Sequence, residues 1–186
     1  MRCLQVFRTP VGGLFRHVRD LSRGLAALGH EVGIICDSTT GGASAEASLA
    51  ALADVCRLGI HRLPIGRLPG LADIAAASAI ARLAHEIRPD ILHGHGAKGG
   101  VYVRLAGPRL KVPALYTPHG GSLHYDWSDP RGAVFLATER LMLRRGAGLL
   151  FVCDYERSLF ERKIGLPGPL STRPIPNPWH SAAGCR

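Results

Sequence analysis

The feature that most constrains this chain is a pair of glycines, Gly12 and Gly13, between a short apolar run and an amphipathic segment. The apolar run covers residues 3–7, and the segment after the glycines carries leucine and valine at spacings of three and four, as a helix packed on a sheet does. A strand that enters a helix through residues without side chains lets a phosphate approach the N–H groups at the positive end of the helix dipole. The pattern therefore predicts an anionic ligand, such as a dinucleotide, a nucleoside triphosphate or a nucleotide-sugar.

Short apolar runs alternate with helical patterns along the chain. The runs that predict strands lie at residues 3–7, 32–36, 58–63, 91–93, 114–116 and 149–153. The patterns that predict helices lie at residues 14–28, 43–55, 76–88, 99–105, 133–145 and 155–164. Surface loops are expected at residues 39–45 and 64–73. Because strands and helices alternate, the sequence predicts an α/β fold with a doubly wound parallel sheet and right-handed crossovers.

The charge of the chain is strongly positive and comes almost entirely from arginine. The formal net charge is +9, and only three of the 23 basic side chains are lysines. The arginines are spread along predicted helix faces, without a basic tail or zinc-finger spacing, so we expect no nucleic-acid partner. Residues 134–150 mix apolar side chains with Arg140, Arg144 and Arg145. This mixture favours peripheral contact with an anionic membrane surface over a membrane span, although a solvated, arginine-rich surface explains the charge equally well.

The cysteines and the amino terminus bear on the cellular compartment. The five cysteines form no C-x-x-C pair and fall mostly in predicted strands, which indicates buried thiols in a reducing environment. The sequence opens directly on a predicted strand, without a charged leader ahead of an apolar stretch. We therefore expect a cytoplasmic protein, peripheral at most to the inner face of the membrane.

A second glycine-rich stretch, Gly94 to Gly99, matches the G-x-G-x-x-G pattern of dinucleotide-binding proteins. That pattern also requires an acidic residue at the end of the following strand to hold a ribose hydroxyl. Here the following strand ends in Thr117-Pro118-His119, which contains no carboxylate. A nucleotide-cofactor oxidoreductase is therefore an alternative with weak support.

Three histidines follow or end two predicted strands. His93, His95 and His119 could be considered a metal site, but no cysteine or carboxylate lies near them in the sequence, and alternating residues of one strand need not converge. We therefore expect no metal. His119, followed by Gly120, lies beyond the carboxyl end of a strand, where open α/β sheets bind ligands. The alternative for His119 is a turn histidine bonded to backbone.

Five segments, in order along the chain, resemble the amino-terminal half of the family 4 glycosyltransferases, enzymes of the GT-B architecture with two Rossmann-like domains. They are the glycine pair with HVRDLSRGLAALGHEVGIICD, then RPDILHGHGAKGG, YTPHG, ERLMLRRGAGLLFVCDYER and RPIPN. The resemblance covers nearly the whole chain and implies a single Rossmann-like half of that architecture. It also implies transfer of a sugar from a nucleotide-sugar, with retention at the anomeric carbon, to a glycan, lipid-linked or small-molecule acceptor. Neither a metal nor another cofactor is implied.

The same resemblance implies roles for individual residues. Gly12 and Gly13 would form the turn whose backbone faces the donor diphosphate and the acceptor. His119 would be the catalytic histidine that hydrogen-bonds the transferred sugar, and Lys98 and Gly120 would be further substrate contacts. A departing nucleoside diphosphate gains negative charge as the glycosidic bond breaks, and preorganised N–H donors at a helix amino terminus stabilise that charge.

The sequence also departs from the family pattern. Pro178 follows Ile-Pro-Asn where the family normally has glycine, and no two glutamates show the E-x7-E spacing of the family's second domain. We expect an acceptor-side domain over residues 1–176 and an atypical tail over residues 177–186. Such a chain is predicted to serve cell-surface polysaccharide or glycolipid synthesis and to be catalytically incomplete without a carboxy-terminal donor-binding domain, supplied in trans. The alternative is a non-catalytic binding module or a split-enzyme subunit.

Overall fold

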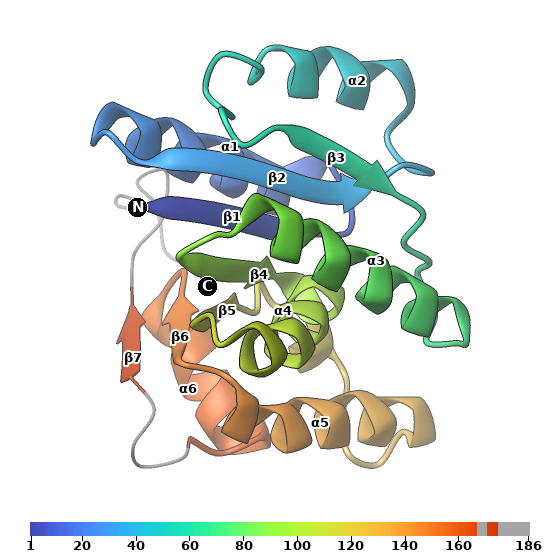
Figure 1. Cartoon of the computed structure of the whole chain (residues 1–186). Helices are drawn as coiled ribbons and strands as arrows, with labels where there is room; N and C mark the ends of the chain where they lie inside the picture. Colours follow the sequence, from blue (N-terminus) through green and yellow to red (C-terminus); the bar gives the residue numbers. More distant parts are fainter. Residues whose placement is uncertain (167–170, 175–186) are drawn as a thin grey trace.

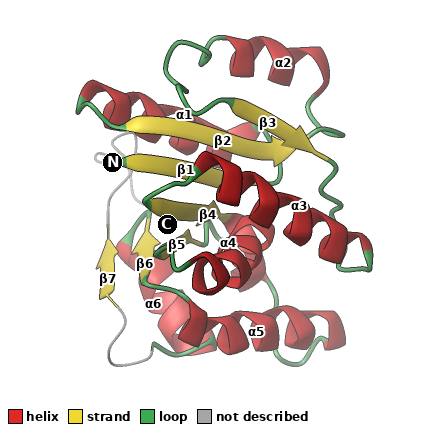
Figure 2. Ribbon diagram, in the orientation of Figure 1, coloured by secondary structure: helices red, strands yellow, loops and turns green. Residues whose placement is uncertain are grey.

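The computed structural model describes residues 1–166 and 171–174, whose strands form a seven-stranded parallel sheet with helices on both faces (Figures 1 and 2). The strands are β1 (Arg2–Phe7), β2 (Glu31–Asp37), β3 (Ile60–Leu63), β4 (Ile91–His95), β5 (Ala114–Thr117), β6 (Gly148–Phe151) and β7 (Ser171–Pro174). The α-helices are α1 (Gly12–Ala27), α2 (Gly42–Ala50), α3 (Ala72–Ile87), α4 (Gly96–Leu110), α5 (Pro130–Met142) and α6 (Asp154–Lys163). Short 3-10 helices, η1 (Gly121–His124) and η2 (Leu143–Arg145), flank α5.

The strand order places the first and fourth strands side by side at the centre of the sheet. The order is β3-β2-β1-β4-β5-β6-β7, and all paired strands are parallel. Phe7 at the end of β1 lies opposite His95 at the end of β4. The chain winds outward in one direction up to β3 and in the other direction after β4, so the switch point of the sheet lies between β1 and β4.

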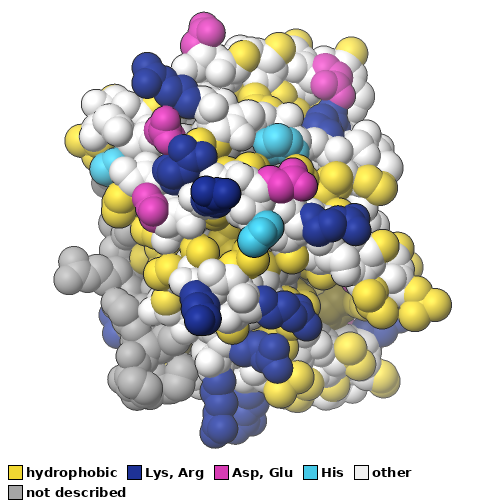
Figure 3. Space-filling view, viewed as in Figure 1, with side chains coloured by type: hydrophobic (Ala, Val, Ile, Leu, Met, Phe, Trp, Pro, Cys, Tyr) yellow, Lys and Arg dark blue, Asp and Glu magenta, His cyan; other side chains and the backbone are white. Residues whose placement is uncertain are grey.

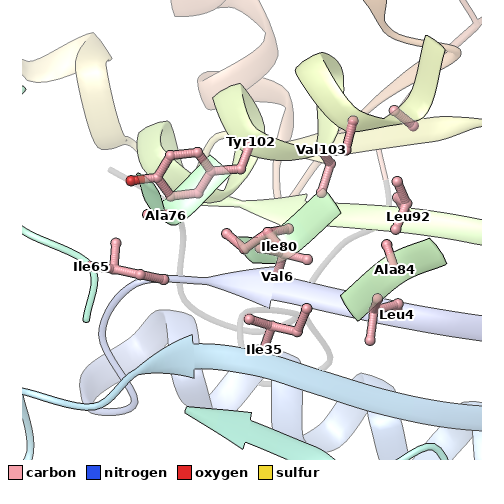
Figure 4. Packing of buried hydrophobic residues seen from close by; sticks show 12 residues of the cluster. Leu4, Val6, Ile35, Ile65, Ala76, Ile80, Ala84, Leu92, Tyr102 and Val103 are labelled. Atoms are coloured by element: carbon pink, nitrogen blue, oxygen red, sulfur yellow. The ribbon is translucent and has the colours of Figure 1, made fainter. Parts of the chain in front are cut away.

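Alternating residues of β1 pack on opposite faces of the sheet. Leu4 and Val6 join a core cluster with Ile80 of α3 and Val103 of α4 (Figure 4). Phe7 faces the other side and packs against Phe15 of α1, with ring centroids 5.9 Å apart. Burying one such side chain contributes about 1.5–3 kcal/mol. Burial on both faces explains why the strands read as continuous apolar runs rather than as alternating ones.

The glycines that match the dinucleotide pattern serve close packing of α4 on the sheet. A side chain at Gly99 would meet the backbone of Val6, and one at Gly100 would meet the ring of Tyr116. A side chain at Gly94 would meet the backbone of Gly99. Contact between helix and strand at this distance accounts for Gly94 and Gly99 of the pattern.

The predicted doubly wound α/β fold is confirmed, with shifted element ends. The strand expected from residue 58 begins only at Ile60, and the second helix ends at Ala50. The helix predicted from residue 99 already starts at Gly96, because the glycines that read as a turn are helical, and it continues through Pro108 to Leu110. β7 was not predicted, since its four residues contain no apolar run.

Other sequence predictions have mixed outcomes. Cys3, Cys36 and Cys56 are buried as expected, and burial raises the pKa of Cys36 and of Cys56 to about 11, whereas Cys153 is partly exposed. The predicted domain end at residue 176 and the tail over residues 177–186 lie outside the described residues. In the part of the chain that the structure describes, no helix is long and apolar enough to cross a membrane.

Candidate active site

The carboxyl ends of three neighbouring strands carry the candidate residues. Gly12 and Gly13 follow β1, His95 ends β4, and His119 follows β5. Since β4 pairs with both β1 and β5, these three ends lie at one edge of the sheet. The strand order reverses here, and ligands of open α/β sheets bind in the crevice at such a point.

The glycine pair opens α1 as the sequence predicts. Gly12 has a φ of +76°, in the region that favours glycine, and a Cβ atom at either glycine would meet nothing within 4 Å. Among the described residues no side chain caps this helix, because Val11 at the N-cap position accepts no N–H. The first N–H groups of α1 are therefore left for a ligand or solvent, at the end of the helix that favours a phosphate.

Four histidines gather beside this turn, and we call His17, His93, His95 and His119 the histidine cluster. His17 comes from α1, His93 and His95 from one side of β4, and His119 from the loop after β5. His95 Nδ1 lies 3.0 Å from His119 Nε2, and the rings of His17 and His119 meet edge to face with centroids 4.9 Å apart. The His93 and His95 centroids are 3.9 Å apart. Residues from three elements thus form one continuous group.

The hydrogen bonds of the cluster assign its protons. His95 Nε2 lies 2.7 Å from Gln5 Oε1, and a carbonyl oxygen only accepts, so His95 carries its proton on Nε2 and accepts at Nδ1. His119 must then donate its Nε2–H to His95. Among the described residues none bonds to His119 Nδ1, so its lone pair can accept a hydrogen bond from a ligand.

Burial keeps the cluster uncharged at neutral pH. Loss of solvent, together with repulsion from a protonated His17, lowers the pKa of His93 and of His119 to about 3. The pKa of His95 falls well below its ordinary value for the same reasons. Burial also lowers the pKa of His17, although Asp20 opposes the change. The cluster therefore offers neutral donors and acceptors rather than positive charge.

The loop that carries His119 is held in an uncommon conformation. His119 has a φ of +53° and Gly120 a φ of +72°. The Gly120 N–H donates to Glu156 Oε1 at 2.6 Å, and the Ser122 hydroxyl donates to Glu139 Oε1 at 3.0 Å. A left-handed conformation costs a residue other than glycine about 1–2 kcal/mol, and such strain concentrates at functional sites. Gly120 is a predicted substrate contact, and its N–H is bonded to Glu156.

Lys98 lies away from the histidine cluster. The sequence placed it in a loop, but it lies in the first turn of α4, where its ammonium pairs with Asp73 Oδ2 of α3 at 2.6 Å. It also donates to the Leu68 carbonyl at 3.0 Å. Although burial opposes ionisation, hydrogen bonds from Lys98 and Tyr102 lower the pKa of Asp73. These bonds direct Lys98 toward α3 and weaken its candidacy as a phosphate contact.

Part of the cluster has the composition of a metal site. One ring nitrogen each from His17, His95 and His119 lies within 4.8 Å of the other two. The histidines considered from the sequence included His93 in place of His17, with the expectation that alternating residues of one strand need not converge, whereas the His93 and His95 ring centroids lie 3.9 Å apart. His93 instead makes a 2.9 Å hydrogen bond with the Thr117 hydroxyl. Metal-free operation of the site stays a prediction.

Three polar residues at this edge were not predicted from the sequence: Gln5, His17 and Asp37. Gln5 is a polar residue in an apolar run, and His17 lies one helical turn after Gly13, so both carried a detectable signal. Asp37 ends β2, where dinucleotide-binding chains hold a ribose, but its carboxylate accepts the Ile65 N–H at 2.8 Å and the Thr39 hydroxyl. These local bonds occupy it.

Comparison with solved structures shows the same fold in glycosyltransferases. A glycosyltransferase from Rickettsia africae matches with a TM-score of 0.72 at 20% identity, over 95% of this chain and 42% of its own. HepE from Anabaena, solved with UDP and glucose, matches with a TM-score of 0.70 at 15% identity, over 95% and 44%. Sucrose-phosphate synthase from Thermosynechococcus elongatus gives 0.65 at 18% identity, over 95% and 48%. The chain therefore spans less than half the length of these three proteins.

Sequence comparison gives the family. No curated protein sequence matches the chain significantly. A family model described as the glycosyl transferase 4-like domain matches residues 12–178, which include the glycine pair, the histidine cluster and the loop after β5. The chain belongs to this family of glycosyltransferase domains, and its fold is one half of the GT-B architecture.

Proposed function

We propose that this domain is the acceptor-side half of a retaining glycosyltransferase that uses a nucleotide-sugar donor. The observation that carries the proposal is the juxtaposition of neutral His119 and the uncapped start of α1 at the switch point. His119 suits a sugar hydroxyl, and the N–H groups at the start of α1 suit a phosphate. Family membership supplies the reaction class, while the donor and the stereochemistry are proposed here.

The glycine pair acts on the leaving group in this proposal. As the bond between sugar and diphosphate breaks, charge develops on the diphosphate oxygens. N–H groups at Gly12 and Gly13, fixed by α1, stabilise that charge without reorganising. A side chain at Gly12 would strain the turn, because its φ is +76°.

His119 orients the sugar in this proposal. Its Nδ1 accepts a hydrogen bond from a sugar hydroxyl, while its Nε2–H is fixed by His95, which is in turn fixed by Gln5. Because burial holds the pKa of His119 at about 3, the ring stays neutral and does not attract the diphosphate away from the helix terminus. His119 is thus a positioning contact to substrate, and the chain Gln5-His95-His119 sets its tautomer.

Most of the nucleotide contacts are proposed to come from a second, donor-binding domain, in the same protein or in trans. The solved relatives named above are about twice as long as this chain, and HepE is solved in complex with UDP and with UDP-glucose. This domain alone is then catalytically incomplete. Calorimetric titration with UDP, GDP and their sugar conjugates, with NAD as control, tests this. We expect no micromolar binding; micromolar affinity for a nucleotide-sugar would show that the domain suffices, and affinity for NAD would favour the oxidoreductase alternative.

We further propose a cytoplasmic location at the inner membrane face, in polysaccharide or glycolipid synthesis. Arg140, Arg144 and Arg145 are exposed around Leu141, whose side chain is 69% exposed. Basic side chains beside an apolar one favour an anionic lipid surface. Binding to vesicles of phosphatidylcholine with phosphatidylglycerol should weaken as salt rises and in Arg144→Glu/Arg145→Glu, but not in Arg82→Glu on α3. Equal sedimentation of both variants with the vesicles would reject the contact.

A further inference from the structure

An apolar groove runs along α4, with α3 and α5 as its walls. Its volume is about 660 Å³, and Val101 and Leu105 of α4 form part of its floor. Ile74, Ala77 and Ala81 line it from α3, and Val134 and Phe135 from α5. Figure 3 shows hydrophobic side chains in the hollow between α3 and α5, with basic side chains nearby. The histidine cluster does not contribute to this groove.

The charge of the groove is positive once internal pairs are counted. Its lining carboxylates are neutralised, because Asp73 pairs with Lys98 and Glu139 pairs with Arg104. Arg67, after β3, and Arg109, at the end of α4, also line it and are exposed. Among the described residues neither arginine forms an ion pair. An apolar channel with unpaired guanidinium groups suits a ligand that is both apolar and anionic.

One end of the groove lies beside the loop that carries His119. Ala97 and Ser122 line that end, and Ser122 is three residues after His119. A Cβ atom at Gly121 would lie only 3.2 Å from the Ala97 amide, so the loop and the start of α4 are in contact. A molecule lying in the groove therefore ends next to the candidate active site.

The walls of the groove bear on its occupant. The lining residues of α4 extend from Ala97 to Arg109, about 18 Å of helix at 1.5 Å per residue. An extended peptide needs backbone hydrogen bonds that helical walls, already paired internally, do not supply. A hydrocarbon chain needs no hydrogen bonds, and an anionic head group on it suits the guanidinium groups of Arg67 and Arg109.

We propose that this groove binds the hydrocarbon chain of a phosphate-bearing lipid, with Arg67 on the phosphate and the polar end beside His119. Leu71 and Ile74, which are 86% and 67% exposed, extend the apolar surface beyond the groove. Binding of the hydrocarbon chain is inferred from the groove alone. The statement that this lipid is the glycosyl acceptor rests on the proposed function.

The direct test is calorimetric titration of the full chain with hexyl, octyl and decyl phosphate below their micellar concentrations. Each buried methylene should tighten binding about three- to fourfold. Inorganic phosphate, which carries the same charge without a chain, should not bind measurably. Affinity that does not depend on chain length, or equal binding of inorganic phosphate, would overturn the proposal in favour of a plain anion site.

Variants distinguish the contacts to the hydrocarbon chain of the lipid from the contacts to its phosphate. Ala77→Phe fills the groove and should weaken decyl phosphate more than tenfold. Ile74→Asp tests the same contact at a largely exposed side chain that the fold does not need. Arg67→Glu should weaken decyl phosphate about tenfold and leave octyl glucoside, which is uncharged, unaffected. Arg82→Glu, exposed on α3 outside the groove lining, is the matched control and should bind as the unmodified chain does.

Two further outcomes decide between this proposal and others. Normal decyl phosphate binding by both Ala77→Phe and Ile74→Asp would overturn it. Concentration-dependent self-association that decyl phosphate does not disturb and Ala77→Phe abolishes would assign the groove to a second copy instead. Failure of the glycosyltransferase proposal is recognised separately, because alkyl phosphates would then still bind while nucleotide-sugars leave His119 undisturbed.

Discussion

Two buried polar networks meet at the loop after β5, and they differ in what they leave free. In one, Arg104 Nη2 donates to Glu139 Oε2 at 2.7 Å, and Tyr116 and Ser122 donate to Glu139 Oε1. The Arg104 guanidinium also lies 4.1 Å from the centre of the Tyr116 ring. The other is the histidine cluster, whose rings are neutral and whose outer member, His119, keeps a lone pair for a ligand.

The difference separates a structural network from a functional one. Arg104 and Glu139 are 1% and 2% exposed, so their charges must compensate each other. Each network holds one buried nitrogen without a partner among the described residues, Arg104 Nη1 in this one and Gln5 Nε2 beside the histidines. Burial, helped by Glu139, raises the pKa of Tyr116 well above its usual value, so its hydroxyl stays a donor. The histidines contain no such charge to compensate. Removing a member should therefore damage stability in the first network and ligand contact in the second.

The largest effect is expected from Glu139→Ala. This change leaves the Arg104 guanidinium buried without a counter-charge, which costs about 3–5 kcal/mol of unfolding free energy. Replacing both partners, as Arg104→Met/Glu139→Leu, should recover most of the loss, because well-packed apolar side chains substitute for a buried ion pair. Urea unfolding of both variants, with the exposed Glu161→Ala as control, measures this. A loss below 1 kcal/mol for Glu139→Ala would mean that the two networks do not differ as described.

The next effect is loss of stability in acid, and it arises from the histidines. An unfolded histidine titrates near pH 6.5, whereas burial lowers the pKa of His93 to about 3 in the folded chain. Between these values the unfolded state binds more protons, so stability is full above about pH 6.5 and falls as the pH drops, by about 1.4 kcal/mol per pH unit for each such histidine. His93→Gln should flatten the slope by about one proton, while the exposed His85→Gln should not. Equal slopes for both variants would contradict burial of a neutral cluster.

The smallest stability effect is expected at His119, with the opposite sign. Because His119 has a φ of +53°, His119→Gly relieves backbone strain and should stabilise the chain by about 1 kcal/mol in urea unfolding, offset in part by the lost bond to His95. The same variant should lose its contact with a sugar. A residue that costs stability and is needed for binding is typical of a functional site. A clear destabilisation by His119→Gly would place His119 in the structural network instead.

The sequence predicted the sheet and the position of His119 beyond the carboxyl end of β5, because both rest on local patterns. Continuous apolar runs report burial on both faces, and a polar residue after a strand marks the ligand edge. The hydrogen bonds that hold the His119 loop in place were not predicted. Gln5, Glu139 and Glu156 lie on other elements, and their bonds to His95, Ser122 and Gly120 join residues 17 to 90 positions apart along the chain. The ion pair of Lys98 was not predicted for a related reason, because its partner Asp73 lies 25 residues away on α3.

The most direct test of the account is a nuclear magnetic resonance titration of histidine-labelled and glycine-labelled chain with UDP-glucose and GDP-mannose at millimolar concentration. Weak binding by this half of the site is sufficient to move resonances. The account predicts shifts at the His119 ring and at the Gly12 and Gly13 amides, with His85 and Gly24 unmoved as internal controls and no response to NAD. Unchanged resonances of His119 and the glycine pair at saturating donor, or shifts confined to other residues, would contradict the assignment of the histidine cluster as the functional network.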